Sequence, residues 1–225
     1  MTFIVFLQLQ VAVIFGIAGA CRREELCQMT LDDIDDVGSA LIVKVRNTKN
    51  KIDRIFTVLN NEEITVNFLQ LFRKYLSLRP SHTKHRRLFV FYKNGKCTSQ
   101  VVGKNILGQV PKKVATFLKL PDTCTYTGHC LRRSSATLLA NEGADLINIK
   151  RHGGWKSSVV AESYIEDSLN NKMKIAKQVL IGGDAVVPST SKGSSSNEFV
   201  NSIPCGFNIN NCNECKIDIT VHVNK

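Results

Sequence analysis

Residues 127–164 read TGHCLRRSSATLLANEGADLINIKRHGGWKSSVVAESY, and this stretch decides the fold. Apolar side chains recur in it at helical spacing. The pattern predicts helices over residues 129–141 and 145–152, and a third helix over 158–180 with a break near Asp167. Three helices in succession indicate a mainly helical domain.

The chain opens with an apolar segment, MTFIVFLQLQVAVIFGIAGA, that resembles a signal peptide or a membrane span. Three features oppose that interpretation. No Lys or Arg precedes the apolar run, Gln8 and Gln10 interrupt it, and it leads without a break into the charged, helix-like CRREELCQM. We therefore expect a buried core helix and no membrane partner.

Strand patterns follow this helix. The cluster of aspartates between Asp32 and Gly38 breaks the helical pattern, and residues 40–46, ALIVKVR, then alternate like a strand. Residues 47–51 form a turn and 54–58, RIFTV, a return strand, so the hairpin presents Lys49 and Lys51 at an exposed tip.

The middle of the chain combines one more strand with further helices. Asn60 is expected to cap a helix that runs to Arg79, with Glu63 completing a capping box. Residues 88–92 read as a strand, and Pro111 divides residues 104–120 into two short helices. The predicted fold class is α+β, mainly helical, with a small antiparallel sheet.

The composition changes after residue 180. Residues 181–198 are rich in Gly and Ser without periodicity, which predicts a flexible linker, and residues 199–225 alternate like a short β-like tail. We therefore expect one globular domain over residues 1–180, followed by the linker and the tail.

The chain is basic, with 30 Lys and Arg against 19 Asp and Glu and a net charge of +11. This balance favours a polyanionic partner, either nucleic acid or an anionic membrane surface. Charge alone does not choose between them, and a merely basic protein would have the same composition.

The eight cysteines are too few for a disulfide scaffold, and their positions indicate a reducing compartment. Five of them lie in or beside apolar segments and are expected to be buried thiols: Cys21, Cys27, Cys97, Cys124 and Cys130. Cys212 and Cys215 form a C-x-x-C near Cys205 and His222 but lack a second ligand pair at comparable spacing. A cysteine-containing strand is the simpler interpretation, and we assign no metal.

Three elements of the opening stretch stand in register. His129 and Arg132 form H-x-x-R, Gly154 precedes Trp155, and Tyr164 lies nine positions after Trp155 (155 to 164). Together they resemble the catalytic motifs of the tyrosine recombinases, the phage integrase-like enzymes, in which the tyrosine is the nucleophile.

Upstream, ACRREEL is similar to the first-arginine motif of that family, G-x-R-x-x-E-L. The resemblance assigns Arg22 as catalytic and Glu25 as its supporting acid, while Ala20 replaces the motif's glycine. It also implies a general-acid lysine in the hairpin turn, for which Lys49 aligns best and Lys51 second.

The resemblance implies DNA strand cleavage and rejoining through a 3′-phosphotyrosine, in recombination, transposition or integration, without a cofactor. It implies double-stranded DNA as the partner and a homo-oligomer assembled on it. Family members carry a DNA-clamping domain before the first arginine, where this sequence has few residues. TGHCLRRSSATLL and KRHGGWKSS look most like Crypton-type transposable elements of animals, which implies a nuclear location.

The residue types suit this chemistry independently. Arg22 and Arg132 offer guanidiniums to the non-bridging oxygens of a phosphodiester, in place of a metal ion. His129 is suited to relay the proton of Tyr164, and Trp155 offers an indole N–H. The basic residues nearby are expected to contact the DNA backbone: Arg133, Lys150, Arg151 and Lys156.

Each of these residues alone has an ordinary structural interpretation, for example Trp155 and Tyr164 as core aromatics. Two other functions share the pattern. One is a domesticated, catalytically silent module that binds DNA or protein, and the other is a type IB topoisomerase-like activity.

Overall fold

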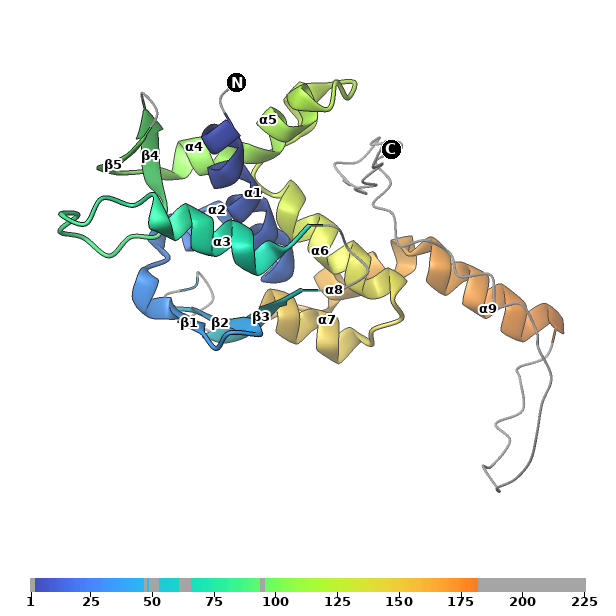
Figure 1. Ribbon diagram of the computed structural model, residues 1–225. Helices are drawn as coiled ribbons and strands as arrows, with labels where there is room; N and C mark the ends of the chain where they lie inside the picture. Colours follow the sequence, from blue (N-terminus) through green and yellow to red (C-terminus); the bar gives the residue numbers. More distant parts are fainter. Residues whose placement is uncertain (1–2, 47, 49–52, 61–65, 94–95, 182–225) are drawn as a thin grey trace, which may run out of the picture.

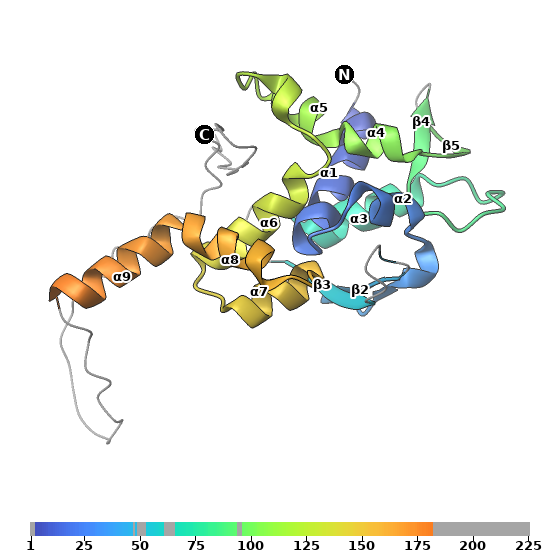
Figure 2. The same ribbon diagram turned by 180° about the vertical axis from the view of Figure 1, so that it is seen from behind.

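The computed structural model describes residues 3–46, 48, 53–60, 66–93 and 96–181 (Figures 1 and 2). It is mainly helical with two small antiparallel sheets, as predicted. The helices are α1 (Phe3–Ala18), α2 (Arg23–Gln28), α3 (Phe68–Ser77), α4 (Lys104–Gly108), α5 (Val110–Phe117), α6 (Cys130–Asn141), α7 (Leu146–Gly153), α8 (Ser158–Asp167) and α9 (Leu169–Ile181). The strands are β1 (Ile34–Asp36), β2 (Ala40–Val45), β3 (Arg54–Leu59), β4 (Val90–Lys93) and β5 (Lys96–Val101).

Helix α1 runs through the centre of the molecule, which confirms the prediction of a core helix (Figure 1). Its Phe15 is fully buried, meets Phe56 of β3 edge-on at 6.0 Å and stacks on Phe72 of α3 at 5.5 Å. One aromatic cluster thus joins α1, the sheet and α3. Among the described residues, no helix has both the length and the apolar character that a bilayer crossing requires.

The expectation that α1 continues into the charged segment without a break is wrong. α1 ends at Ala18, and Ala20 has a φ of +44°, in the left-handed region that favours glycine. The chain therefore turns sharply before α2 begins at Arg23. Ala20 stands where the resembling motif has glycine, and this backbone geometry gives the physical reason for the motif's preference.

The larger sheet has the order β1-β2-β3. β2 and β3 pair in the register Val43↔Phe56 and Val45↔Arg54, which confirms the predicted hairpin, and its turn lies outside the described residues except for Thr48. The aspartate-rich segment was expected only to break the pattern, but Ile34–Asp36 adds the edge strand β1. Pairing with β2 outweighs the low strand propensity of aspartate there.

β4 and β5 form a second, two-stranded sheet, which confirms the strand expected at residues 88–92. The predicted cap of α3 is wrong. Asn67 caps this helix by accepting a hydrogen bond from Gln70 N, whereas the Asn60 amide oxygen accepts one from Leu69 N across the loop. Glu63 lies outside the described residues.

The remaining helices confirm the predicted pattern. Pro111 stands in the first turn of α5, after α4 has ended, and Ser168 separates α8 from α9. Helices α6, α7 and α8 meet in a small cluster of buried residues that includes Ala136, Ala161 and Ile149. Short side chains let these backbones approach closely, which fixes the helix that carries Tyr164 against the body of the domain.

No disulfide links any of the described cysteines. Cys21, Cys97 and Cys130 are buried as expected and Cys27 is half-buried, but Cys124 is exposed, because it lies in a one-turn helix at the surface, Thr123–Thr125. Residues 182–225, with most of the expected linker, the tail and its C-x-x-C, lie outside the described residues.

Candidate active site

Two helix C-termini face each other at the centre of the site. α1 closes at Ala20 and α7 closes at Gly154, both with left-handed backbone. The turn after α7 uses the carbonyls of Lys150 and Arg151 for its own hydrogen bonds. The carbonyls of the next two residues, His152 and Gly153, have no partner within the helix, and the C-terminal end of each helix carries partial negative charge.

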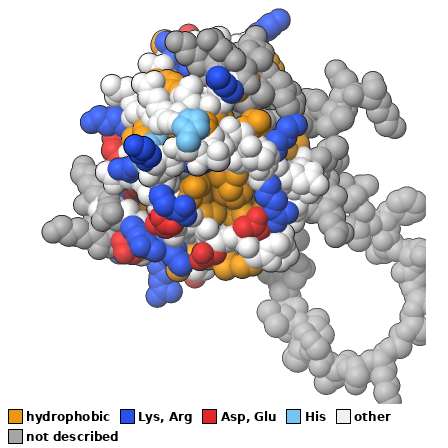
Figure 3. All heavy atoms as spheres, turned by 60° about the vertical axis from the view of Figure 1, so that its left-hand side comes forward, with side chains coloured by type: hydrophobic (Ala, Val, Ile, Leu, Met, Phe, Trp, Pro, Cys, Tyr) orange, Lys and Arg blue, Asp and Glu red, His pale blue; other side chains and the backbone are white. Residues whose placement is uncertain are grey.

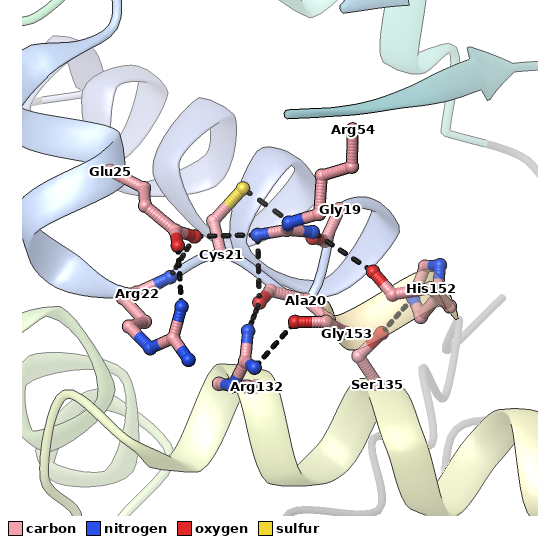
Figure 4. Close-up of polar contacts among 10 residues, drawn as sticks. All are labelled: Gly19, Ala20, Cys21, Arg22, Glu25, Arg54, Arg132, Ser135, His152 and Gly153. Carbon is pink, nitrogen blue, oxygen red and sulfur yellow. Dashed lines mark hydrogen bonds and ion pairs between the residues drawn. The ribbon is translucent and has the colours of Figure 1, made fainter. Parts of the chain in front are cut away.

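Two buried arginines fill the space between these helix ends (Figure 4). Arg132 of α6 donates to Ala20 O at 2.7 Å and to Gly153 O at 2.5 Å. Arg54 of β3 donates to Gly19 O and to His152 O, the latter at 3.0 Å. Each guanidinium therefore connects the end of α1 to the end of α7.

A single buried carboxylate connects this pair to Arg22. Glu25 Oε2 accepts from Arg54 Nη2 at 2.5 Å and from the backbone N–H of Arg22 at 2.9 Å. Glu25 Oε1 accepts from Arg22 Nη1 at 2.7 Å. The side chains of Glu25 and Arg54 are 3% and 7% exposed, whereas that of Arg22 is 17% exposed, so Arg22 lies nearest to solvent.

Positive charge exceeds negative charge at this site, since Arg22, Arg54 and Arg132 share one carboxylate. Burial, together with the charges of Arg22 and Arg54, lowers the pKa of Arg132 to about 10. Both terminal nitrogens of Arg132 retain a second N–H beyond the bond each makes to a carbonyl. A site with this surplus favours an anion, and its fork-shaped donors suit a phosphate group.

Arg132 leads directly to the aromatic pair. Its guanidinium carbon lies 4.3 Å from the centroid of the Trp155 ring, and that ring lies 5.4 Å from the ring of Tyr164 at 42°. Burial raises the pKa of Tyr164, while the nearby Arg133 and Arg132 lower it. Burial also raises the pKa of the Cys21 thiol, to about 12, so this neighbouring thiol stays protonated at neutral pH.

The structure thus brings together five of the predicted residues: Arg22, Glu25, Arg132, Trp155 and Tyr164. His129 precedes the first turn of α6 and is exposed, and no contact joins its side chain to these five among the described residues. Lys49 and Lys51 lie outside the described residues.

A groove of about 590 Å³ lies beside the arginines, between β3 and α7. Lys150 and Arg151 line it, and Lys150 also donates to Ser158 Oγ at 3.1 Å. Arg133, Arg151 and Lys156 are exposed. Ser157 occupies the N-cap position of α8, but its side chain makes no capping hydrogen bond.

The residues predicted to contact the DNA backbone do not belong to a uniformly basic surface. Figure 3 shows acidic side chains among the basic ones on one face of the molecule. Several exposed bases are paired with carboxylates, such as Arg73 with Asp36 and Arg86 with Asp32. The Lys and Arg side chains at the groove are therefore better placed to bind a polyanion than the arginines that are paired with aspartates.

Sequence reasoning missed Arg54 and His152. A usable signal existed for Arg54, because strand alternation places it on the same face as Phe56 and Val58, and an inward-facing charge requires partners. His152 lies three residues before Trp155, and its Nε2 lies 2.7 Å from Ser135 Oγ. Nothing in the sequence distinguishes it from a surface histidine of a basic helix end.

Comparisons with known proteins agree with this geometry. The sequence profile of the phage integrase family matches residues 7–170. A solved structure of the XerH site-specific recombinase bound to palindromic difH substrate has a TM-score of 0.60 and 18% identity over 79% of this chain and 47% of its own. The XerA recombinase has a TM-score of 0.59 and 22% identity over 77% and 57%.

This chain therefore spans about half the length of the solved structures that it matches. At these identities the likeness shows the fold alone. A search of curated proteins found no match. The family profile, however, covers most of the chain and all the described site residues. The chain belongs to the phage integrase family, the tyrosine recombinases.

Proposed function

We propose that this chain cleaves and rejoins DNA strands through a covalent bond between Tyr164 and a 3′-phosphate. One observation carries the proposal: Arg22 and Arg54 pair with the Glu25 carboxylate, and the guanidinium of Arg132, which has no such pair among the described residues, lies over the ring of Trp155 beside Tyr164. A phosphodiester would supply the missing negative charge beside the nucleophile.

In the proposed first step, Tyr164 Oη forms a bond to phosphorus and the bond from phosphorus to O5′ breaks. The proton of the tyrosine passes to the His129 imidazole, and the Lys49 ammonium donates a proton to O5′. Burial raises the pKa of Tyr164, so the phenol gives up its proton less readily and a base assists the attack. Arg22 and Arg132 would stabilise the charge on the non-bridging oxygens.

Rejoining reverses the same step. A 5′-hydroxyl from another strand attacks phosphorus and gives its proton to Lys49, while His129 returns a proton to Tyr164. The number of phosphodiester bonds is unchanged, so the exchange needs neither a nucleotide cofactor nor an external energy source.

The proposed substrate is double-stranded DNA, held through Arg133, Lys150, Arg151 and Lys156 at its backbone. We propose residues 1–180 as the catalytic domain, acting with a separate DNA-clamping domain. Assembly on DNA as a homo-oligomer is supported by α9, which projects from the body and exposes apolar side chains: Leu169, Met173, Ile175, Val179 and Leu180 (Figure 1).

The finer assignment is to Crypton-type mobile elements of animals, with recombination, integration or transposition in the nucleus. This assignment is supported by the amino-acid sequence of residues 127–139 and 150–158. Accumulation of the tagged chain outside the nucleus would contradict this part of the proposal.

The test is covalent trapping. The chain, fused to a DNA-clamping domain, is incubated with a nicked duplex whose short cleaved end diffuses away, so that rejoining cannot follow cleavage; the same fusion is the parent in every trapping assay below. A protein–DNA species that survives denaturant supports the proposal, whereas binding without such a species supports a catalytically silent module. Relaxation of a supercoiled plasmid without joined recombinant products would instead indicate a topoisomerase-like activity.

A further inference from the structure

We infer that Arg54 is a positioning residue of this site: it aligns Arg22 and Arg132 on one phosphate by connecting the ends of α1 and α7 to Glu25. The inference rests on the proposed function, since it concerns the arginines that would bind the scissile phosphate. Arg54 would not itself contact the phosphate and would act through Arg22 and Arg132.

The hydrogen bonds of Arg54 connect three of the segments around the site (Figure 4). Its Nη1 donates to Gly19 O and His152 O, and its Nη2 donates to Ala20 O at 3.3 Å and to Glu25 at 2.5 Å. These acceptors belong to the end of α1, the start of α2 and the end of α7. The planar fork of arginine reaches such divergent acceptors, whereas the single ammonium of lysine does not.

The contact with Glu25 determines how Arg22 is held. Arg54 and Arg22 share the Glu25 carboxylate, at 2.5 Å and 2.7 Å. Without Arg54, the carboxylate would be free to pair with Arg22 alone and neutralise it. With Arg54 present, part of the charge of Arg22 remains available to an incoming anion.

The contact with His152 determines where the aromatic pair lies. His152 and Gly153 are the last residues of α7, Arg54 binds the carbonyl of the first and Arg132 binds that of the second. Trp155 follows two residues later and lies over Arg132. Loss of Arg54 would remove one of the side-chain contacts that hold this turn, leaving those of Arg132 and Ser135, and would loosen the position of Trp155.

The hydrogen bonds of Arg54, rather than its burial, argue against a direct role in phosphate binding. Its Nη1 and Nη2 each donate to two protein acceptors, so neither terminal nitrogen keeps an N–H for a phosphate, whereas each terminal nitrogen of Arg132 does. Arg54 also stands at the base of the β2–β3 hairpin, opposite Val45. It therefore fixes the sheet to the site as well as the two helix ends to each other.

The test compares Arg54→Lys with Arg73→Lys in the full chain. Lysine keeps the charge and most of the stem at both positions. Arg73 is a matched control, because like Arg54 it pairs with a carboxylate and donates to a backbone carbonyl. Its guanidinium lies 2.7 Å from both carboxylate oxygens of Asp36 and donates to Gly38 O. That pair is exposed and lies outside the site.

The first readout is the fluorescence of Trp155, the only tryptophan in the chain. We expect Arg54→Lys to keep the circular dichroism of the parent while its emission shifts to the red and acrylamide quenches it more strongly. Arg73→Lys should match the parent. Parent-like quenching in Arg54→Lys would overturn the inference, and this readout does not require DNA cleavage.

The second readout is covalent trapping at saturating DNA. Arg54→Lys should bind DNA like the parent and form the adduct roughly 100-fold more slowly, because small misplacements of reacting groups have effects of this size. The defect should shrink below roughly ten-fold on DNA with a neutral methylphosphonate at the scissile position, because less charge then needs stabilising. A purely structural defect would slow both substrates equally and would overturn the inference.

If Arg54→Lys does not fold, Glu25→Gln interrupts the same connection from the other side and should give the same two signatures. Absence of an adduct in the parent refutes the proposed function, and Trp155 quenching then decides the role of Arg54 by itself. An adduct in the parent with unchanged trapping in Arg54→Lys refutes only the positioning role.

Discussion

The guanidinium of Arg132 lies 4.3 Å from the centre of the Trp155 ring while its two terminal nitrogens bind the ends of α1 and α7. One side chain thus holds two helix ends and an aromatic ring together. The ring in turn contacts Tyr164, so the position of the proposed nucleophile depends on this stack.

The stack requires a glycine at position 153. A Cβ built there would overlap the six-membered ring of Trp155. Gly153→Ala should therefore displace the ring from Arg132 and lower the free energy of unfolding by about 1–3 kcal/mol, as other overpacked sites do. Urea denaturation measures this loss. Gly103→Ala is the control, because a Cβ at Gly103 meets nothing within 4 Å, and a similar loss there would contradict the explanation.

His152 should make stability depend on pH. Burial, together with the charges of Arg54 and Arg132, lowers its pKa from an ordinary value of 6.5 to about 4. Between these values the unfolded chain binds a proton that the folded chain does not. Stability is therefore complete above about pH 6.5 and falls as the pH drops toward 4, by about 2 kcal/mol for a partly buried group.

Urea unfolding at several pH values between 7 and 4 measures this dependence, and His152→Gln should flatten it. Asp36 does not interfere, because Arg73 lowers its pKa to about 2, and its contribution to stability is lost only at lower pH. An unchanged slope in His152→Gln would show that another group titrates in this window.

DNA binding should be salt-sensitive and should depend on the groove beside α7. Arg151 is exposed and lines this groove, so Arg151→Ala should weaken binding to different sequences alike and reduce the slope of log affinity against log salt by about 1. Arg86→Ala is the control, because Arg86 already pairs with Asp32 at 2.6 Å. Equal effects of both changes would mean that the basic charge acts without a defined site.

Strand cleavage should survive removal of divalent metal ions. Arg22 and Arg132 provide the positive charge that a cation provides elsewhere, so a chelator should leave the rate of adduct formation within about two-fold of its value in untreated buffer. The trapping assay with and without chelator measures this. Cleavage that stops and returns only with added Mg²⁺ would show that the arginines do not serve this purpose.

Much of the fold could be predicted from sequence, because periodicity reports directly which face of an element is buried. The core position of α1, the β2–β3 hairpin and the division of α4 from α5 at Pro111 follow from such patterns. Strand β1 could not be predicted in this way, because its aspartate-rich residues form a strand only through pairing with β2. The end of α1 at Ala18 depends on a left-handed alanine that no propensity favours.

The site was predictable where motifs have fixed spacing and unpredictable where contacts cross the fold. Arg22, Glu25, Arg132, Trp155 and Tyr164 come together as the spacing suggested. Arg54 was missed because its acceptors lie 35 positions away at Gly19 and 98 positions away at His152. His129 precedes the first turn of α6 and is exposed, and its role in proton transfer stays a prediction.

The central claim is that the hydroxyl of Tyr164 becomes bonded to DNA. Tyr164→Phe removes one oxygen and keeps the ring that packs on Trp155, so it should bind DNA like the parent. Tyr126 and Tyr75 serve as internal controls, because both are buried and the Tyr75 hydroxyl accepts a hydrogen bond from Val90 N at 3.1 Å.

The most direct measurement is peptide mapping of the denaturant-stable species that forms on a nicked duplex. The account predicts that the parent carries the DNA phosphate on Tyr164 and that Tyr164→Phe forms no adduct while still binding DNA. An adduct that persists in Tyr164→Phe, or that maps to Tyr126 or Tyr75, would contradict it.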